Sequence, residues 1–257
     1  MGSSDRRAVL ALFGALGSLV LLPGCGNAKA ALPDYRYRLT VEIETSEGVR
    51  TGSSVIEVST AVAGRNSIPT PGVVSHRLRG EAVTVDLGTR GLLFALLRSD
   101  DNSDWASNVM FGFAPEMPAV YDSDGKFDST AHFHARFTAM LKNREPIVLP
   151  QRFRGSRYIE GGFARPMLVR FADIADPTTV EKVDPDNLAA SFGPGVKIKR
   201  IIVQLTDDPV TTGIERHLGW LPYQRGSLVR IPRGVPIGDM PIGSELTEGD
   251  FSRSLIL

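Results

Sequence analysis

The clearest pattern in the chain is a strict alternation of apolar and polar residues at positions 35–44. In the segment YRYRLTVEIE, tyrosine, leucine, valine and isoleucine alternate with arginine, threonine and glutamate. A period of two is typical of a strand that buries one face and exposes the other. A turn follows at positions 46–48, and GSSVIEVS at positions 52–59 predicts a returning strand. We therefore expect an antiparallel hairpin at the start of the folded region.

Two further strands are predicted after a loop rich in proline and glycine at positions 64–72. The segments EAVTVDLG (81–88) and LLFALL (92–97) have the composition of a strand pair. The second segment is an uninterrupted apolar run, which predicts a strand that is buried on both faces.

A different pattern recurs in the C-terminal half, where an apolar strand, an Asp-Pro pair and a short helix follow one another. It occurs at positions 167–183 and again at 201–218, where Thr212 and Glu215 have capping-box spacing. Both copies indicate strands that lead into short helices. The predicted class is therefore α+β, a β-rich fold with an antiparallel, hairpin-containing sheet and a few short helices.

One more short helix is predicted in the segment NLAASFG. Asp184 precedes it as the expected N-cap, Pro185 suits the first helical position, and Gly193 is the expected stop.

The composition indicates a single globular domain with a sizeable core. Of 257 residues, 42% are hydrophobic and 23% are charged, and lysine plus arginine equal aspartate plus glutamate at 29 each. No change in composition marks a second domain. We predict one β-rich domain at positions 34–257, with its apolar C-terminal end docked onto the body.

The first 25 residues are organised differently. Arg6 and Arg7 precede fifteen uncharged residues from Ala8 to Leu22, a run shorter than the about 18–20 residues that span a membrane. The run ends in Leu-Pro-Gly-Cys at positions 22–25. This order of basic, apolar and small residues before a cysteine resembles the lipobox of bacterial lipoprotein signals, with Pro23 at a position where that family more often has a smaller residue.

The resemblance implies a signal peptide at positions 1–24, cleavage between Gly24 and Cys25, and lipidation of Cys25, followed by a tether at positions 25–33. Each buried methylene of an acyl chain contributes about 0.8 kcal/mol, so that two or more chains anchor a protein stably. The implied location is the cell envelope, with the lipid on Cys25 in a bacterial membrane and the domain facing the periplasm or the outside. The alternative is a buried core cysteine behind an uncleaved membrane helix.

Local fingerprints of catalysis or cofactor binding are missing from the sequence. It contains no G-x-S-x-G, H-E-x-x-H, G-x-x-x-x-G-K-[ST], G-x-G-x-x-G or C-x-x-C, and we expect no cofactor. His132 and His134 invite a shared metal site. However, Phe133 and Phe137 have helical spacing behind Ser129 or Thr130 as caps, and on a helix two residues at i and i+2 point in nearly opposite directions. Helix-surface histidines are therefore the prediction.

The acidic segment DSDGKFD at positions 122–128 resembles the middle of a calcium loop. Asp122, Asp124 and Asp128 occupy ligand positions, but Val120 and Ala131 stand where two further ligands belong. An acidic turn that caps the next helix explains the same residues, and we prefer it.

An arginine-rich segment, QRFRGSRYIEGGFAR at positions 151–165, interleaves basic and aromatic residues. A solvated arginine-rich loop is the preferred interpretation. Behind an export signal, the alternative is contact with an anionic envelope component or an acidic protein face, and we expect no nucleic acid partner. The candidate contact residues are Arg152, Arg154, Arg157 and Arg165.

The segments YRYRLTVEIET and DDPVTTGIERHLGWL resemble exported bacterial proteins without an assigned activity, and no catalytic residue follows from that resemblance. The predicted function is that of a lipid-anchored envelope protein acting as a non-catalytic binding or assembly module. The alternative is an anchored envelope hydrolase that uses His132, His134 or His217 with carboxylates from positions 100–128, a stretch with seven carboxylates and one lysine. His217 is otherwise expected on a short amphipathic helix with Trp220, as a residue at the boundary between core and surface.

Overall fold

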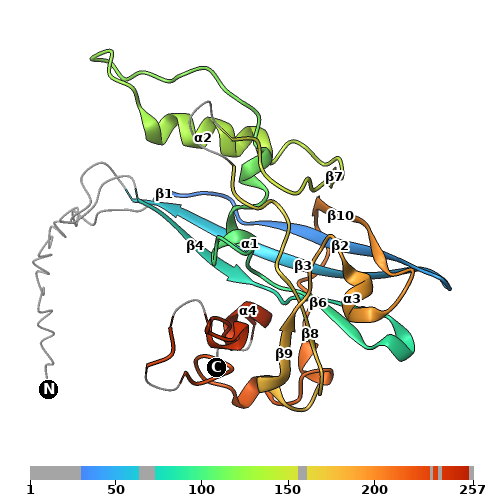
Figure 1. The fold of residues 1–257 in the computed structure, drawn as a ribbon. Coiled ribbons are helices and arrows are strands. Elements are labelled where there is room, and N and C mark those ends of the chain that lie inside the picture. Colours follow the sequence, from blue (N-terminus) through green and yellow to red (C-terminus); the bar gives the residue numbers. More distant parts are fainter. Residues whose placement is uncertain (1–29, 64–72, 156–160, 232–233, 237–238, 255–257) are drawn as a thin grey trace, which may run out of the picture.

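The structure is a computed structural model that describes residues 30–63, 73–155, 161–231, 234–236 and 239–254. The described residues form two antiparallel sheets with a few short helices, so the fold is α+β and β-rich, as predicted (Figure 1). The predicted loop at 64–72 and the whole signal segment, Cys25 included, lie outside the described residues. No helix among the residues described is long and apolar enough to cross a bilayer.

Six strands of the described chain form the larger sheet. Five of them follow the order β1-β3-β2-β10-β7, and the sixth, β4, also pairs with β3. Four strands form the second sheet, in the order β5-β6-β8-β9. The strands of the larger sheet are β1 (Ala30–Ala31), β2 (Tyr35–Thr45), β3 (Gly48–Val62), β4 (Val74–Arg79), β7 (Ile147–Val148) and β10 (Lys197–Thr206). Those of the second sheet are β5 (Val83–Asp86), β6 (Leu92–Ala95), β8 (Leu168–Phe171) and β9 (Val180–Lys182).

Short helices connect and cover these strands. The α-helices of the described residues are α1 (Trp105–Asn108), α2 (Ser129–Met140), α3 (Leu188–Phe192) and α4 (Glu248–Phe251). The 3-10 turns are η1 (Gly88–Arg90), η2 (Phe111–Phe113), η3 (Pro177–Thr179), η4 (Ile214–Arg216), η5 (Leu221–Tyr223) and η7 (Ile242–Ser244).

The predicted hairpin is confirmed as β2 and β3, which pair along their whole common length from Tyr35 opposite Val58 to Thr45 opposite Gly48. The apolar residues of the alternating segment are buried on one face of β2, and its arginines and glutamates lie on the other. Five residues before this strand, Ala30 pairs with β3, and the Leu32 N–H donates to the Thr60 carbonyl at 3.0 Å. The described fold therefore begins inside the predicted tether of 25–33.

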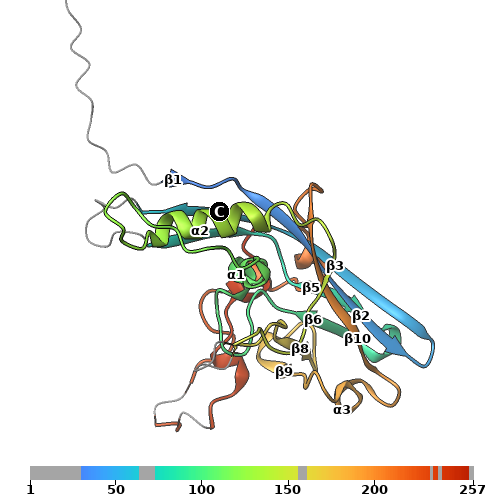
Figure 2. The same cartoon turned by 90° about the horizontal axis from the view of Figure 1, so that it is seen from above.

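The buried face of the hairpin is covered in two places. The ring of Phe137 from α2 lies 5.7 Å from the ring of Tyr35, at the start of β2. The second sheet covers the other end, where Val83 and Leu93 join the same core as Val41. Seen from above, α2 and the second sheet accordingly lie toward opposite ends of the long strands (Figure 2).

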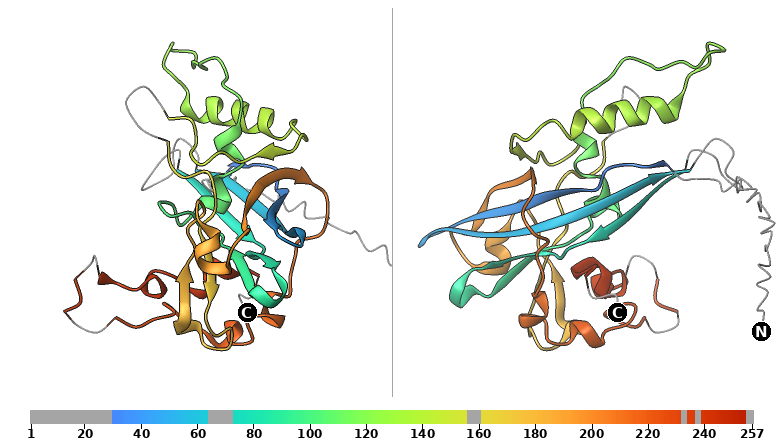
Figure 3. Two further views of the ribbon diagram at one scale, coloured as in Figure 1. Left: turned by 45° about the vertical axis from the view of Figure 1, so that its right-hand side comes forward. Right: turned by 180° about the vertical axis from the view of Figure 1, so that it is seen from behind.

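The second sheet is buried on both faces, as predicted from the run LLFALL. Leu93 faces the larger sheet, whereas Phe94 and Leu96 face a separate core that includes Leu246 and Phe251. The C-terminal segment thus covers the far side of the second sheet, away from α2 (Figure 3). The Ala82 N–H donates to the Phe251 carbonyl at 2.8 Å, so the predicted docking of the C-terminal end is observed as far as Ser254.

Two predicted helix starts are wrong. α3 begins at Leu188 behind Asn187, because the Asp184 carboxylate accepts the Asp186 N–H at 2.9 Å and closes a turn that leaves Pro185 outside the helix. The predicted stop at Gly193 is confirmed by its φ of 87°.

The second wrong start is the capping box of Thr212 and Glu215. The turn η4 follows Gly213, and its first N–H, that of Ile214, is accepted at 3.0 Å by the carboxylate of Glu81 on a distant part of the chain. The cap is a tertiary contact, which local spacing does not reveal.

Candidate functional site

The three histidines of the predicted hydrolase do not meet a carboxylate. His132 and His134 lie on α2, which confirms the helix, and the His132 Nδ1 is 3.2 Å from the Pro118 carbonyl oxygen. The His134 Nε2 is buried without a hydrogen-bond partner among the described residues. His217 is exposed just after η4 rather than on a longer helix. Within the described chain, no ion pair joins any of the three to an acid.

The acidic segment forms the predicted turn. The Asp122 carboxylate accepts the N–H groups of Asp124 and Lys126, both at 3.0 Å. The cap of α2 is Asp128, which accepts the Ala131 N–H at 3.0 Å, and not Ser129 or Thr130 as predicted. Among the described residues, no group of three or more histidine, cysteine or acidic side chains has the arrangement of a metal site.

The arginine-rich segment is only partly described, because Arg157 lies outside the described residues. The Arg152 guanidinium stacks 4.1 Å from the centre of the Phe163 ring, and the Arg165 Nε donates to the Leu149 carbonyl at 3.3 Å. Arg154 is exposed. Arg152 and Arg165 line a cavity of about 90 Å³, but Asp100 and Asp186 line the same cavity. The arginines are therefore partly neutralised there and do not form a uniformly basic face.

A larger pocket lies beside a histidine that the motifs did not single out. It has a volume of about 250 Å³ and is bounded on one side by three consecutive residues of β4, His76, Arg77 and Leu78. We call it the β4 pocket. Its other lining residues are Leu97, Ser103, Asp104, Ser107 and Arg253.

Local structure explains how these residues come together. The side chains of β4 alternate, so that His76 and Leu78 turn inward while Arg77 and Arg79 are exposed. The opposite wall is α1 with the turn before it, which is held under the hairpin by a 2.7 Å hydrogen bond from the Tyr37 hydroxyl to the Ala106 carbonyl. The third wall is the docked C-terminal segment.

His76 is the titratable centre of the β4 pocket. Its Nδ1 lies 3.0 Å from the Thr60 Oγ1 on β3, so that Thr60 orients the ring. Burial lowers the pKa of His76, while the nearby Asp104 carboxylate raises it to a smaller extent. The imidazole is therefore neutral at neutral pH, and its two nitrogens provide one donor and one acceptor.

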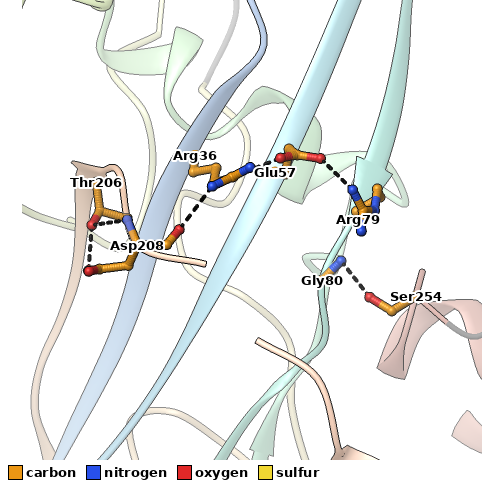
Figure 4. Close-up of polar contacts among 7 residues, drawn as sticks. All are labelled: Arg36, Glu57, Arg79, Gly80, Thr206, Asp208 and Ser254. Carbon is orange, nitrogen blue, oxygen red and sulfur yellow. Dashed lines mark hydrogen bonds and ion pairs between the residues drawn. The ribbon is translucent and has the colours of Figure 1, made fainter. Parts of the chain in front are cut away.

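On the outer face of the same strands, Glu57 joins β2, β3 and β4 (Figure 4). Its carboxylate accepts the Arg36 Nε at 2.7 Å and the Arg79 Nη1 at 3.0 Å. The hydrogen bond from Arg36, with the charges of both arginines, holds the pKa of Glu57 below its usual range against the opposing effect of burial. Glu57 thus fixes the position of β4 and of its terminal Arg79.

The arrangement is suited to binding a ligand through neutral hydrogen bonds and apolar contact, with arginine at the rim. The sequence contained one signal for it, since VSHRLR alternates and so places His76 and Leu78 on one face. What brings Asp104 and Arg253 to that face is tertiary packing. The chain matches no protein-family model, and no similar protein was found among curated proteins or solved structures.

Proposed function

We propose that this protein is a lipid-anchored protein of the bacterial cell envelope that acts as a binding or assembly module. The anchor follows from the order of residues 6–25, in which two arginines, an uncharged run and Leu-Pro-Gly precede Cys25. The lipid on Cys25 would hold the domain at a membrane, facing the periplasm or the outside.

The observation that carries the proposal is the short separation between Cys25 and the sheet. The first described residue, Ala30, is already paired with β3, and five residues extend at most about 17 Å. An acylated Cys25 would therefore keep the sheet close to the bilayer, where it is restricted to partners at the same surface. Such confinement favours binding or assembly through a raised effective concentration.

A binding role is preferred to the hydrolase for a geometric reason. His132, His134 and His217 are each separate from the carboxylates of positions 100–128 within the described residues, whereas the β4 pocket offers a neutral imidazole, hydroxyl groups and apolar carbons. Those groups can hold a ligand through hydrogen bonds and apolar contact. Asp104 also lines the pocket and acts on His76 through its charge, but among the described residues the hydrogen bond of His76 is to Thr60 and not to Asp104.

The first test is the chemical state of the mature N-terminus. The full chain is expressed in a bacterium and purified from membranes, and the N-terminal peptide is analysed by mass spectrometry. We expect it to begin at Cys25 and to carry acyl chains, and we expect the variant Cys25→Ala to lose both the lipid and membrane association. A purified chain that retains residues 1–24, or an unmodified Cys25, contradicts the anchor.

The second test addresses assembly. A C-terminally tagged, lipidated chain is crosslinked in cells, with the Cys25→Ala variant as the control. We expect one partner at near-equal amount with the lipidated chain and much less with the variant. Absence of any recurrent partner, while Cys25 is acylated, contradicts the assembly role and leaves the anchor standing.

A further inference from the structure

We propose that the outer edge of β4, with which no strand of the described chain pairs, binds an extended, acidic peptide segment of a partner protein as an added antiparallel strand, with alternate side chains of that segment entering the β4 pocket. The proposal rests on the proposed function for the existence of a partner, and it names the surface that the partner uses.

The backbone of β4 has a row of hydrogen-bonding groups with which no described strand pairs. The Ala63 N–H donates to the Val73 carbonyl at 2.9 Å, which makes 73 and 63 a hydrogen-bonded pair of the β3–β4 ladder. In an antiparallel ladder such pairs alternate, so 75, 77 and 79 also bond to β3. The N–H and C=O groups of residues 74, 76 and 78 therefore point away from β3, and no strand of the described chain pairs with them.

The protein itself shows that this edge accepts an antiparallel strand. One position further along, the outward carbonyl of Gly80 accepts the Arg253 N–H at 2.9 Å, and Glu81 is bridged to Ser252 in antiparallel sense. The Ser254 hydroxyl accepts the Gly80 N–H at 3.1 Å (Figure 4). A strand that continues in the same register would next meet the outward groups of Leu78 and then those of His76.

The β4 pocket lies where the side chains of that added strand would point. One of its walls consists of residues 76–78, and Arg253 borders it at the end where the existing pairing stops. Its volume of about 250 Å³ is below the about 300–1,000 Å³ of typical small-molecule sites, so it fits side chains better than a cofactor. Strand addition gains affinity from the main chain and specificity from such pockets.

The charges beside the edge select an acidic strand. Arg77 and Arg253 are exposed and have no ion-pair partner among the described residues, in contrast to Arg79, which binds Glu57. Inside the pocket Asp104 disfavours an inward carboxylate, and Leu78 and Leu97 favour apolar atoms. The best segment therefore alternates apolar residues facing inward with acidic residues facing Arg77, because opposite charges across a strand pair attract.

The probe is a fluorescent, capped octapeptide of alternating valine and glutamate, titrated against the full lipidated protein in detergent micelles and followed by anisotropy. We expect saturable binding, and much weaker binding of the matched peptide of alternating valine and lysine. Amide hydrogen exchange should slow on binding at the outward amides of residues 74, 76 and 78, which have no backbone partner among the described residues.

A modified peptide tests main-chain recognition without altering the protein. Methylation of the peptide nitrogens that face β4 should abolish binding, whereas methylation of the nitrogens on the other edge should leave it unchanged.

Variants of the protein test the same surface. Arg77→Ser should weaken binding about two- to fivefold. His76→Pro removes an outward N–H that β3 does not use and should weaken binding about tenfold relative to His76→Ala, which keeps it.

Several results would overturn the proposal. These are an absence of saturable binding, equal binding of the lysine peptide, or indifference to which peptide nitrogens are methylated. Binding that requires deletion of residues 255–257 would show that the chain's own end occupies the edge and would equally overturn it. The anchor is judged separately: an acylated Cys25 with no peptide binding defeats only this proposal, and peptide binding with an unmodified Cys25 defeats only the anchor.

Discussion

Gly52 of β3 lies directly against the backbone of Thr84 of β5, so closely that a Cβ atom at Gly52 would stand 2.1 Å from the Thr84 carbonyl oxygen. This is where the second sheet crosses the larger one. The absence of a side chain at Gly52 allows the two backbones to approach, and the neighbouring Val83 completes the contact. The relative placement of the two sheets therefore depends on one glycine.

Substitution of Gly52 tests this dependence. The clash of Gly52→Ala is with backbone atoms, so side-chain rotation does not relieve it. We therefore expect the free energy of unfolding to fall by at least about 1–3 kcal/mol. Gly219→Ala is the matched control, since a Cβ at Gly219 meets no atom within 4 Å, and its effect should stay within about 0.5 kcal/mol. Urea unfolding measures both. Equal stability of the two variants would contradict the close crossing.

Two buried serines test the energetic cost of a buried hydroxyl, because one hydroxyl has a hydrogen-bond partner and the other has none among the described residues. Ser54 is 1% exposed and its hydroxyl has no partner among the described residues, whereas the Ser99 hydroxyl, 0% exposed, donates to Asp101 at 2.7 Å. A buried hydroxyl without a hydrogen bond costs about 1–3 kcal/mol in mutational data. We expect Ser54→Ala to be neutral or stabilising and Ser99→Ala to destabilise by about 1–2 kcal/mol. Thermal unfolding measures the stability of both variants. A larger loss of stability for Ser54→Ala than for Ser99→Ala would show that the Ser54 hydroxyl has a hydrogen-bond partner.

The local patterns of the sequence predicted much of the strand structure. The alternation at positions 35–44 and the uninterrupted apolar run at 92–97 were sufficient to predict strands. Successive side chains of a strand point to opposite faces, so its own sequence shows whether one face or both faces are buried. Helix starts were predicted less well. Asp184 and Thr212 both have capping side chains at suitable spacings, but Asp184 closes a turn and the N–H of Ile214 is taken by Glu81 from more than a hundred residues away.

The candidate site was not predicted, and the reason is physical. His76 has no neighbouring residue in the sequence that marks it, and its partners Thr60, Asp104 and Arg253 come from three separate segments. The predicted candidates were conspicuous in the sequence, yet the Asp122 carboxylate closes a turn by accepting the Lys126 N–H, and the His132 Nδ1 lies against the Pro118 carbonyl oxygen. A site whose residues are brought together by tertiary packing is difficult to recognise from the spacing of residues along the sequence.

The pKa of Glu57 predicts how stability changes in acid. Because the folded pKa is lowered, the contribution of Glu57 is fully present above the ordinary value of 4.5 and is lost as the pH falls through the lowered pKa. Glu57→Gln should therefore destabilise by about 1–2 kcal/mol at pH 7 and by less at pH 3. Glu44→Gln, in the exposed pair with Lys197, is the control and should change stability too little to resolve. A loss for Glu57→Gln that is independent of pH would assign the effect to packing rather than charge.

Glu81 should show the opposite dependence on pH. It is 4% exposed, and burial raises its pKa, although the Ile214 N–H that it accepts acts against the shift. A raised folded pKa means that its contribution is most favourable below the ordinary value of 4.5 and declines as the pH rises through the raised pKa. In Glu81→Gln the amide oxygen still accepts from Ile214 and carries no charge at any pH. The melting temperature of the variant should equal or exceed that of the wild type at pH 7.5, and this advantage should shrink at pH 5. A variant that is less stable than the wild type at pH 7.5 but not at pH 5 would mean that the charge of Glu81 stabilises the docked C-terminal segment.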